Sequence, residues 1–237
     1  MENKKGNVDD IIVSYTALRK AIGILGIMFP VILIAGAYIM QFCEPIQSSI
    51  SCYYHTVMRN VFEGVLWVFA VFLLFYRYEK TDNVATTAAG FCALGVALFP
   101  TLVRNCSTCD YLCSSSCMTE NCREVIGRFH LTFASLFFLI LSWISLFLFT
   151  KTDKTKKPTL MKIRRNRVYI VCGIIMLVCI VLIGIYFLCL KTKYPWLDKC
   201  NPVFWLEAAA LWSFGISWIV KGDTILKDKT EPIVLSS

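Results

Sequence analysis

Apolar residues in this chain gather in six long runs that are separated by short polar segments. Each run is close to the roughly 20 residues that an α-helix needs to cross about 30 Å of hydrocarbon. The runs are Ala21–Met40, Val61–Tyr76, Val84–Val103, Leu131–Phe149, Val168–Leu190 and Val203–Val220. Because lipid offers no hydrogen-bond partners to backbone N–H and C=O groups, these runs predict helices.

The pattern therefore predicts an all-α fold, an integral membrane bundle of six transmembrane helices over residues 21–220. The polar segments at the two ends, residues 1–20 and 221–237, show no sign of a separate domain. The first run is too long for the core of a signal peptide and lacks a small-residue cleavage site, so we expect a retained span. Pro30 and Pro100 lie in the first and third runs, where proline can kink a helix.

Composition and charge support this interpretation and give it an orientation. The chain is 57% hydrophobic, whereas the apolar share of soluble domains is usually below half, and its formal net charge is +8. Of the 24 Lys and Arg residues, 17 fall in the two ends and in the second and fourth connections. Lys and Arg favour cytoplasmic loops, so the distribution predicts that both termini are cytoplasmic, N-in and C-in. Topology explains the charge, and no nucleic-acid partner is expected.

Two further features bear on packing and partners. Small residues such as Gly23, Gly26 and Gly215 predict close contacts between spans, since they let neighbouring backbones approach in lipid. The basic connection 151–167 can attract anionic lipid, so membrane lipid is a predicted partner.

Twelve cysteines are present, and eight of them fall in the segments predicted to face outward. These eight are Cys43, Cys52, Cys106, Cys109, Cys113, Cys117, Cys122 and Cys200. In an oxidising compartment, short loops without a core are commonly held by disulfides, which is the interpretation we favour for this cysteine-rich outer loop. A tetrahedral zinc bound by thiolates and a set of free thiols are the alternatives.

Polar residues also gather where three spans meet the outer boundary. Ser51, His55, Arg59 and Glu63 are spaced by four, so one continuous helix would place them in a stripe on one side. Glu63 lies about one turn inside the hydrocarbon, where a charge costs roughly 2.5–3.5 kcal/mol, and Arg59 is its nearest partner. His130 opens the fourth span and Glu207 the sixth at a similar depth.

This cluster admits three interpretations. The first is a site for a lipid headgroup or small molecule, formed by Tyr54, His55, Arg59, Glu63, His130, Trp205 and Glu207. The second is a membrane hydrolase, with Ser51, His55, His130 and Glu207 as catalytic candidates and His55, His130 and Glu207 as candidate zinc ligands. The third is an ion-paired network that orients the helices, in a protein whose outer loop meets a protein partner or a second copy.

Two resemblances follow from these residues. Ser51 and His55, followed by a carboxylate, resemble the opening of the CREST superfamily of zinc-dependent membrane hydrolases. That family has seven spans and a His-x3-His pair on the last one, both of which are missing here, so we transfer none of its catalytic roles.

The second resemblance covers most of residues 14–222. The segments that carry it are Ser49–Gly64, Gly95–Thr101, Arg165–Gly173, Trp205–Ala210 and Gly215–Trp218. They resemble a group of uncharacterised bacterial six-span proteins that are distantly similar to the DRAM and Frag membrane families. The resemblance implies a six-span fold in the bacterial inner membrane and no particular reaction. Asn60 stands where that group has an acid, Glu63 where it has an apolar residue, and the cysteine cluster looks like an insertion.

Overall fold

The computed structural model describes residues 2–40, 46–76, 80–102, 120–152 and 159–222, and these residues form helices and no strand. The long helices are α1 (Glu2–Ile39), α2 (Arg59–Phe75), α3 (Lys80–Leu98), α4 (Glu120–Trp143), α5 (Leu160–Ile185) and α7 (Pro202–Lys221). The π-helical turns η2 (Ile144–Leu148) and η3 (Tyr186–Leu190) extend α4 and α5. The remaining elements are the 3-10 helices η1 (Ile50–His55) and η4 (Pro195–Cys200) and the short α6 (Lys191–Lys193).

Each of the six apolar runs lies largely within one of the long helices, so the predicted all-helical fold is confirmed. Four stretches are long and apolar enough to cross a membrane: Tyr15–Ile39, Asn121–Leu148, Leu160–Lys193 and Pro202–Lys221. The other two helices are shorter in their apolar parts. α2 has 17 residues, about 25 Å of helix, and the apolar part of α3 is Asn83–Leu98.

Proline acts differently in the first and third helices. α1 continues through Pro30 to Ile39. α3 ends at Leu98, five residues before the predicted boundary, because the residue before a proline avoids the helical conformation and Pro100 follows closely.

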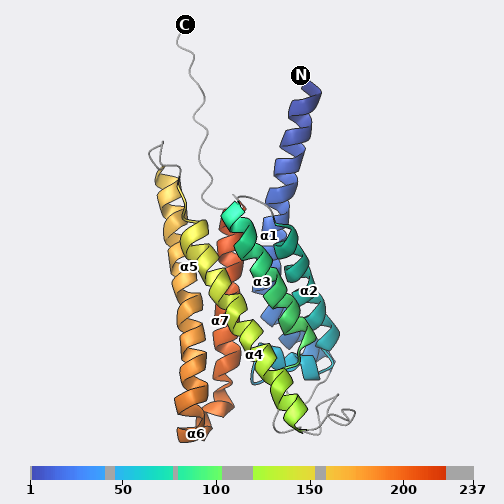
Figure 1. The fold of residues 1–237 in the computed structure, drawn as a ribbon, viewed down its shortest axis with the longest axis vertical. Helices are drawn as coiled ribbons and strands as arrows, with labels where there is room; N and C mark the ends of the chain where they lie inside the picture. Colours follow the sequence, from blue (N-terminus) through green and yellow to red (C-terminus); the bar gives the residue numbers. More distant parts are fainter. Residues whose placement is uncertain (1, 41–45, 77–79, 103–119, 153–158, 223–237) are drawn as a thin grey trace.

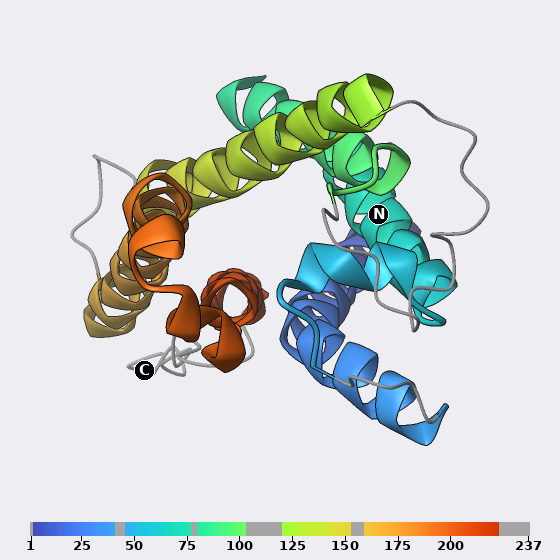
Figure 2. The same ribbon diagram turned by 90° about the horizontal axis from the view of Figure 1, so that it is seen from below.

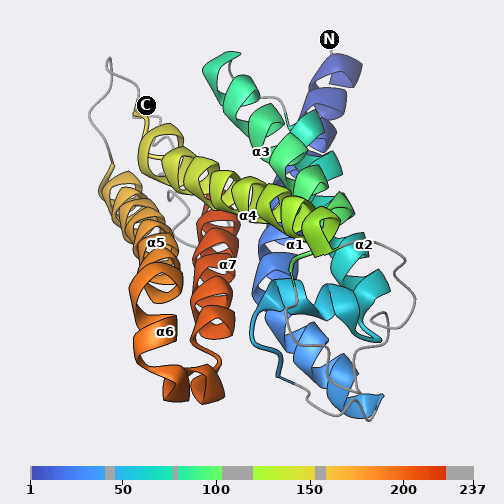
Figure 3. The same cartoon turned by 60° about the horizontal axis from the view of Figure 1, so that its bottom comes forward.

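The six long helices run alternately up and down, so α1 begins and α7 ends at the same end of the bundle (Figure 1). Extensive packing joins α1 to α7, α7 to α5, α3 to α4 and α2 to α3, whereas α1 and α2 touch at few places. The view along the bundle in Figure 2 shows α4 crossing from α3 to α5. η1 and η4 both lie at the lower end of the bundle, which we call the η1 end (Figure 3). The opposite end, where α7 stops, is the Lys221 end.

The closest helix contact joins α1 and α7 through two glycines. A Cβ added at Gly23 would lie 2.6 Å from the carbonyl oxygen of Gly215, and one added at Gly215 would lie 2.5 Å from the carbonyl oxygen of Gly23. Only the absence of both side chains permits this approach. The predicted packing role of Gly23, Gly26 and Gly215 is confirmed.

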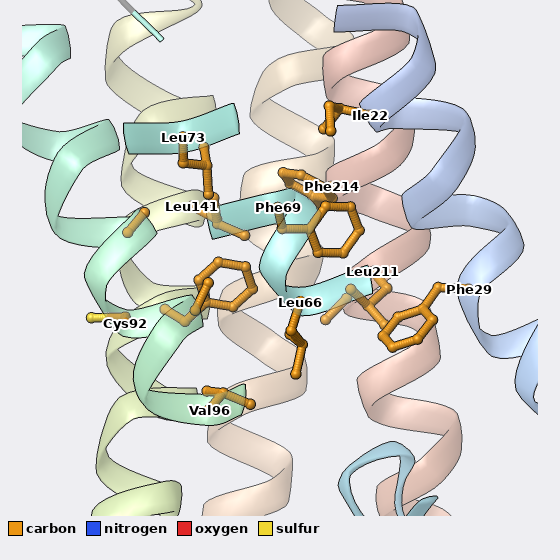
Figure 4. Close-up of a cluster of buried hydrophobic side chains, with 14 of the residues drawn as sticks. Ile22, Phe29, Leu66, Phe69, Leu73, Cys92, Val96, Leu141, Leu211 and Phe214 are labelled. Carbon is orange, nitrogen blue, oxygen red and sulfur yellow. The ribbon is translucent and has the colours of Figure 1, made fainter. Parts of the chain in front are cut away.

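The core between the helices is apolar and rich in aromatic rings. Phe69 of α2 meets Phe214 of α7 edge to face, with ring centroids 5.5 Å apart, and Phe29 of α1 packs on Phe69 at 6.2 Å (Figure 4). Leu66 and Leu211 lie beside these rings in the same layer. This layer holds α1, α2 and α7 together and brings the start of α7 next to the segment that precedes α2 at the η1 end.

Candidate functional site

The predicted stripe of polar residues is split between two helices. Ser49 caps η1, since its hydroxyl accepts a hydrogen bond from the Cys52 amide at 3.1 Å. η1 ends after His55, and the Thr56 hydroxyl then accepts a hydrogen bond from the Met58 amide at 3.1 Å. The expectation of one continuous helix is therefore wrong: a turn at residues 56–58 separates Ser51 and His55 from Arg59 and Glu63.

Arg59 is held by two partners at the start of α2. Its Nε donates to the Glu63 carboxylate at 2.6 Å, which confirms the predicted pair. Its Nη2 donates to the Tyr54 hydroxyl at 2.7 Å, and the guanidinium carbon lies 4.4 Å from the centre of the Tyr54 ring. Burial raises the pKa of the Tyr54 phenol, so it remains protonated at neutral pH. The Arg59 side chain is 37% exposed, so this group is reachable from outside.

Both histidines bind the end of α3. His55 Nε2 donates to the Thr101 carbonyl at 2.9 Å, and His130 Nδ1 donates to the Phe99 carbonyl at 2.6 Å. These carbonyls flank Pro100, where the helix has stopped and its last carbonyls lack helical partners. His130 is only 3% exposed, and its Nε2 forms no hydrogen bond with the residues that the structure describes.

Glu207 binds the backbone at the start of η1, as an acceptor. Its carboxylate accepts a hydrogen bond from the Ile50 amide at 2.5 Å, and Ser51 contacts the same carboxylate. Two nearby contacts strengthen the attachment: the Phe204 amide donates to the Ser48 carbonyl, and the Asn201 side chain donates to the Ile46 carbonyl. The segment before α2 is thus pinned to the start of α7.

The described structure does not assemble the three candidate zinc ligands. His55 and His130 turn nitrogens to the carbonyls at the end of α3, whereas Glu207 contacts the first residue of η1, at the other end of that helix. Among the residues described, no three His, Cys, Asp or Glu side chains lie close enough to hold a metal ion. The Ser51 hydroxyl is engaged by Glu207, an arrangement that gives it an anchoring role.

Of the eight cysteines predicted to face outward, the structure describes Cys52, Cys122 and Cys200. Cys43, Cys106, Cys109, Cys113 and Cys117 lie outside the described residues. No disulfide joins two of the described cysteines, and Cys52 and Cys200 are free thiols. Ser48 and Ser49 contact the Cys52 sulfur at 3.3 and 3.1 Å, and burial raises the pKa of this thiol. Cys122 lies in α4. The disulfide-held loop stays a prediction.

The sequence predicts which side chains gather at the η1 end of the bundle, but it does not predict most of their hydrogen-bond partners. Three of the partners are backbone groups, at Ile50, Phe99 and Thr101, which residue types do not reveal. Pro100 was the available signal, because a proline that ends an apolar helix leaves carbonyls that need donors. The Trp205 side chain is 46% exposed and packs on Phe204.

Comparisons with known protein families, curated proteins and solved structures found no match to this chain.

Proposed function

We propose that this chain is a six-span protein of a bacterial inner membrane, with the Lys221 end in the cytoplasm and the η1 end outside. The alternating direction of the six long helices supports this arrangement (Figure 1). Arg19, Lys20 and Lys221 stand at the Lys221 end, as cytoplasmic boundaries favour. α2 and α3 are the shorter helices, and a bilayer accommodates a short helix by thinning locally at modest cost.

At the η1 end the site binds an anionic lipid headgroup or a small anionic molecule. Arg59 is the observation that carries this proposal. A guanidinium has five N–H donors, and the contacts with Glu63 and Tyr54 use two of them. The remaining donors belong to a side chain that is 37% exposed, and arginine donors match the oxygens of a phosphate or carboxylate.

The neighbouring contacts support the proposal by fixing this arginine in place. Glu63 and the Tyr54 ring hold the guanidinium from two sides, so binding an anion costs little side-chain entropy. Tyr54 is in turn fixed by η1, which Glu207 attaches to α7. Arg59 is thus a fixed cation at the lipid boundary. It favours a ligand whose negative charge lies next to its acyl chains, as in an anionic lipid.

The test compares Arg59→Ala with Arg128→Ala. Arg128 is a matched control because it also lies at the η1 end and pairs with a carboxylate four residues away, Glu124, at 3.5 Å. We expect Arg59→Ala to weaken the binding of one phosphatidylglycerol by about ten-fold, the loss of one charge-assisted contact of about 1.4 kcal/mol, so that native mass spectrometry of the full-length protein shows one bound lipid fewer. Arg128→Ala should retain the wild-type amount. Equal retention in all three proteins would contradict the proposal.

A further inference from the structure

A second site lies far from Arg59, in a groove between α1 and α2 at the Lys221 end. The groove has a volume of about 530 Å³. It is lined by Tyr15, Leu18, Ile22, Trp67, Val68, Val71, Phe72, Phe75 and Tyr76. Apart from the hydroxyl groups of the two tyrosines and the indole nitrogen, the lining side chains are hydrocarbon, so the groove suits an apolar occupant.

α1 and α2 make few contacts with each other. Toward the η1 end Phe29 of α1 stacks on Phe62 of α2, with ring centroids 5.9 Å apart, and Gly36 leaves room for the Met58 side chain. Toward the Lys221 end the rings of Tyr15 and Tyr76 meet, and the groove runs along the two helices from there. The side chains along the groove consequently remain open to their surroundings: Leu18 is 48% exposed and Val71 is 49% exposed.

The end of the groove at Tyr15 and Tyr76 is aromatic and borders positive charge. The rings of Tyr15 and Tyr76 meet edge to face at 6.5 Å, and Tyr76 packs against Trp218 at 5.0 Å. The guanidinium carbon of Arg19 lies 5.3 Å from the centre of the Tyr76 ring, and its Nη1 donates to the Lys221 carbonyl at 3.4 Å. Arg19 is thereby positioned beside the groove, and Lys20 follows it in α1.

We propose that the groove holds an acyl chain of an anionic phospholipid whose phosphate lies against Arg19. The lining matches the chain, and the guanidinium matches the headgroup. A lipid in the cytoplasmic leaflet presents both parts in this order, with charge at the boundary and hydrocarbon inside. A second copy of this chain is a poorer occupant, because a two-fold interface here would bring Arg19 against the same arginine of the other copy.

This site is independent of the one proposed at Arg59. Arg59 and Phe75 stand at opposite ends of α2, 16 residues and about 24 Å apart along the helix. A lipid bound at Arg19 therefore belongs to the other leaflet. A negative result in the experiment on one site therefore does not affect the proposal for the other.

The experiment fills the groove and compares the result with an equal change elsewhere. Val71→Trp adds bulk inside the groove, and Val178→Trp adds the same bulk on α5, where the valine is also 49% exposed. Full-length protein is incubated in vesicles of phosphatidylcholine and phosphatidylglycerol at 3:1, extracted gently, and examined by native mass spectrometry. We expect Val71→Trp to lower the population of protein that carries the groove phospholipid at least three-fold, with the lipid at Arg59 still bound, and Val178→Trp to leave both unchanged.

Headgroup recognition is tested separately with Arg19→Gln. The preference for phosphatidylglycerol over phosphatidylcholine should fall about five-fold, as expected for one basic residue at an anionic surface. Lys20→Gln removes a charge from the side of α1 that faces away from the groove, and it should leave the preference unchanged. Equal lipid retention by the two tryptophan variants would overturn the proposal. Loss of a dimer in Val71→Trp, without loss of lipid, would overturn it in favour of a second copy.

Discussion

At the scale of single residues, the ionisable side chains at the η1 end satisfy the backbone where helices stop. His55 and His130 donate to carbonyls beside Pro100, and Glu207 accepts from the first amide of η1. Buried N–H and C=O groups without partners cost free energy, and apolar surroundings offer no water to replace them. These three residues therefore have a structural role that is already visible, whereas the role proposed for Arg59 depends on a ligand.

Glu207 provides the test of this role. In Glu207→Ala the Ile50 amide loses its acceptor, and we expect the free energy of unfolding in mixed detergent micelles to fall by about 1–3 kcal/mol. Glu207→Gln keeps an oxygen acceptor of the same shape and should lose less. If both variants lost the same free energy, the carboxylate charge rather than the hydrogen bond would be the important feature, and the anchoring role described above would be incorrect.

The contrast between Arg59 and the histidines shows how much of the site the sequence predicts. The pairing of Arg59 with Glu63 was predictable because residues four apart share one side of a helix. The partners of His55 and His130 were not, because every residue carries a carbonyl and only the fold decides which one is left without a helical donor. The zinc hypothesis arose because the sequence does not reveal these carbonyl partners. It grouped side chains by their expected depth in the membrane, whereas η1 separates Glu207 from both histidines.

At the scale of elements, small residues and prolines decide where helices meet and end. The six helices were predictable since hydrocarbon requires them. The end of α3 at Leu98 was signalled by Pro100, although the apolar run continues to Val103. The turn at residues 56–58 was not predictable, because the spacing of residues does not reveal that the Thr56 hydroxyl accepts from the Met58 amide there. Gly23 and Gly215 illustrate the opposite case, in which a sequence signal for close packing is realised in the contact of α1 with α7.

Gly23→Leu tests this contact against a matched glycine. The new side chain would collide with the backbone of α7, so we expect a loss of about 1–3 kcal/mol in the free energy of unfolding. Gly184 lies in α5 with nothing within 4 Å of an added Cβ, and Gly184→Leu should cost nothing or stabilise the helix slightly. Equilibrium unfolding of both variants in the same micelles gives the comparison. Equal losses would mean that the cost comes from replacing any glycine rather than from this contact.

At the scale of the whole molecule, two different surfaces stand at the two ends of one bundle. The η1 end carries Arg59, held by Glu63 and Tyr54, among polar residues that bind the backbone, and the Lys221 end carries Arg19 beside an apolar groove. The proposed functions place a lipid at each end, one in each leaflet. This scheme depends on the orientation in the membrane, which the distribution of Lys and Arg predicts and which a labelling experiment can measure.

Cys200 reports this orientation because it is an exposed thiol in the η4 turn at the η1 end. A membrane-impermeant maleimide applied to intact cells after mild reduction should label Cys200, as located by peptide mapping. Lys20→Cys places a thiol at the Lys221 end, and it should react only after the cells are permeabilised. The reverse pattern would invert the topology and exclude the cytoplasmic-leaflet lipid at Arg19. If Cys200 reacts only after reduction, it forms a disulfide in cells, whereas the structure has it as a free thiol.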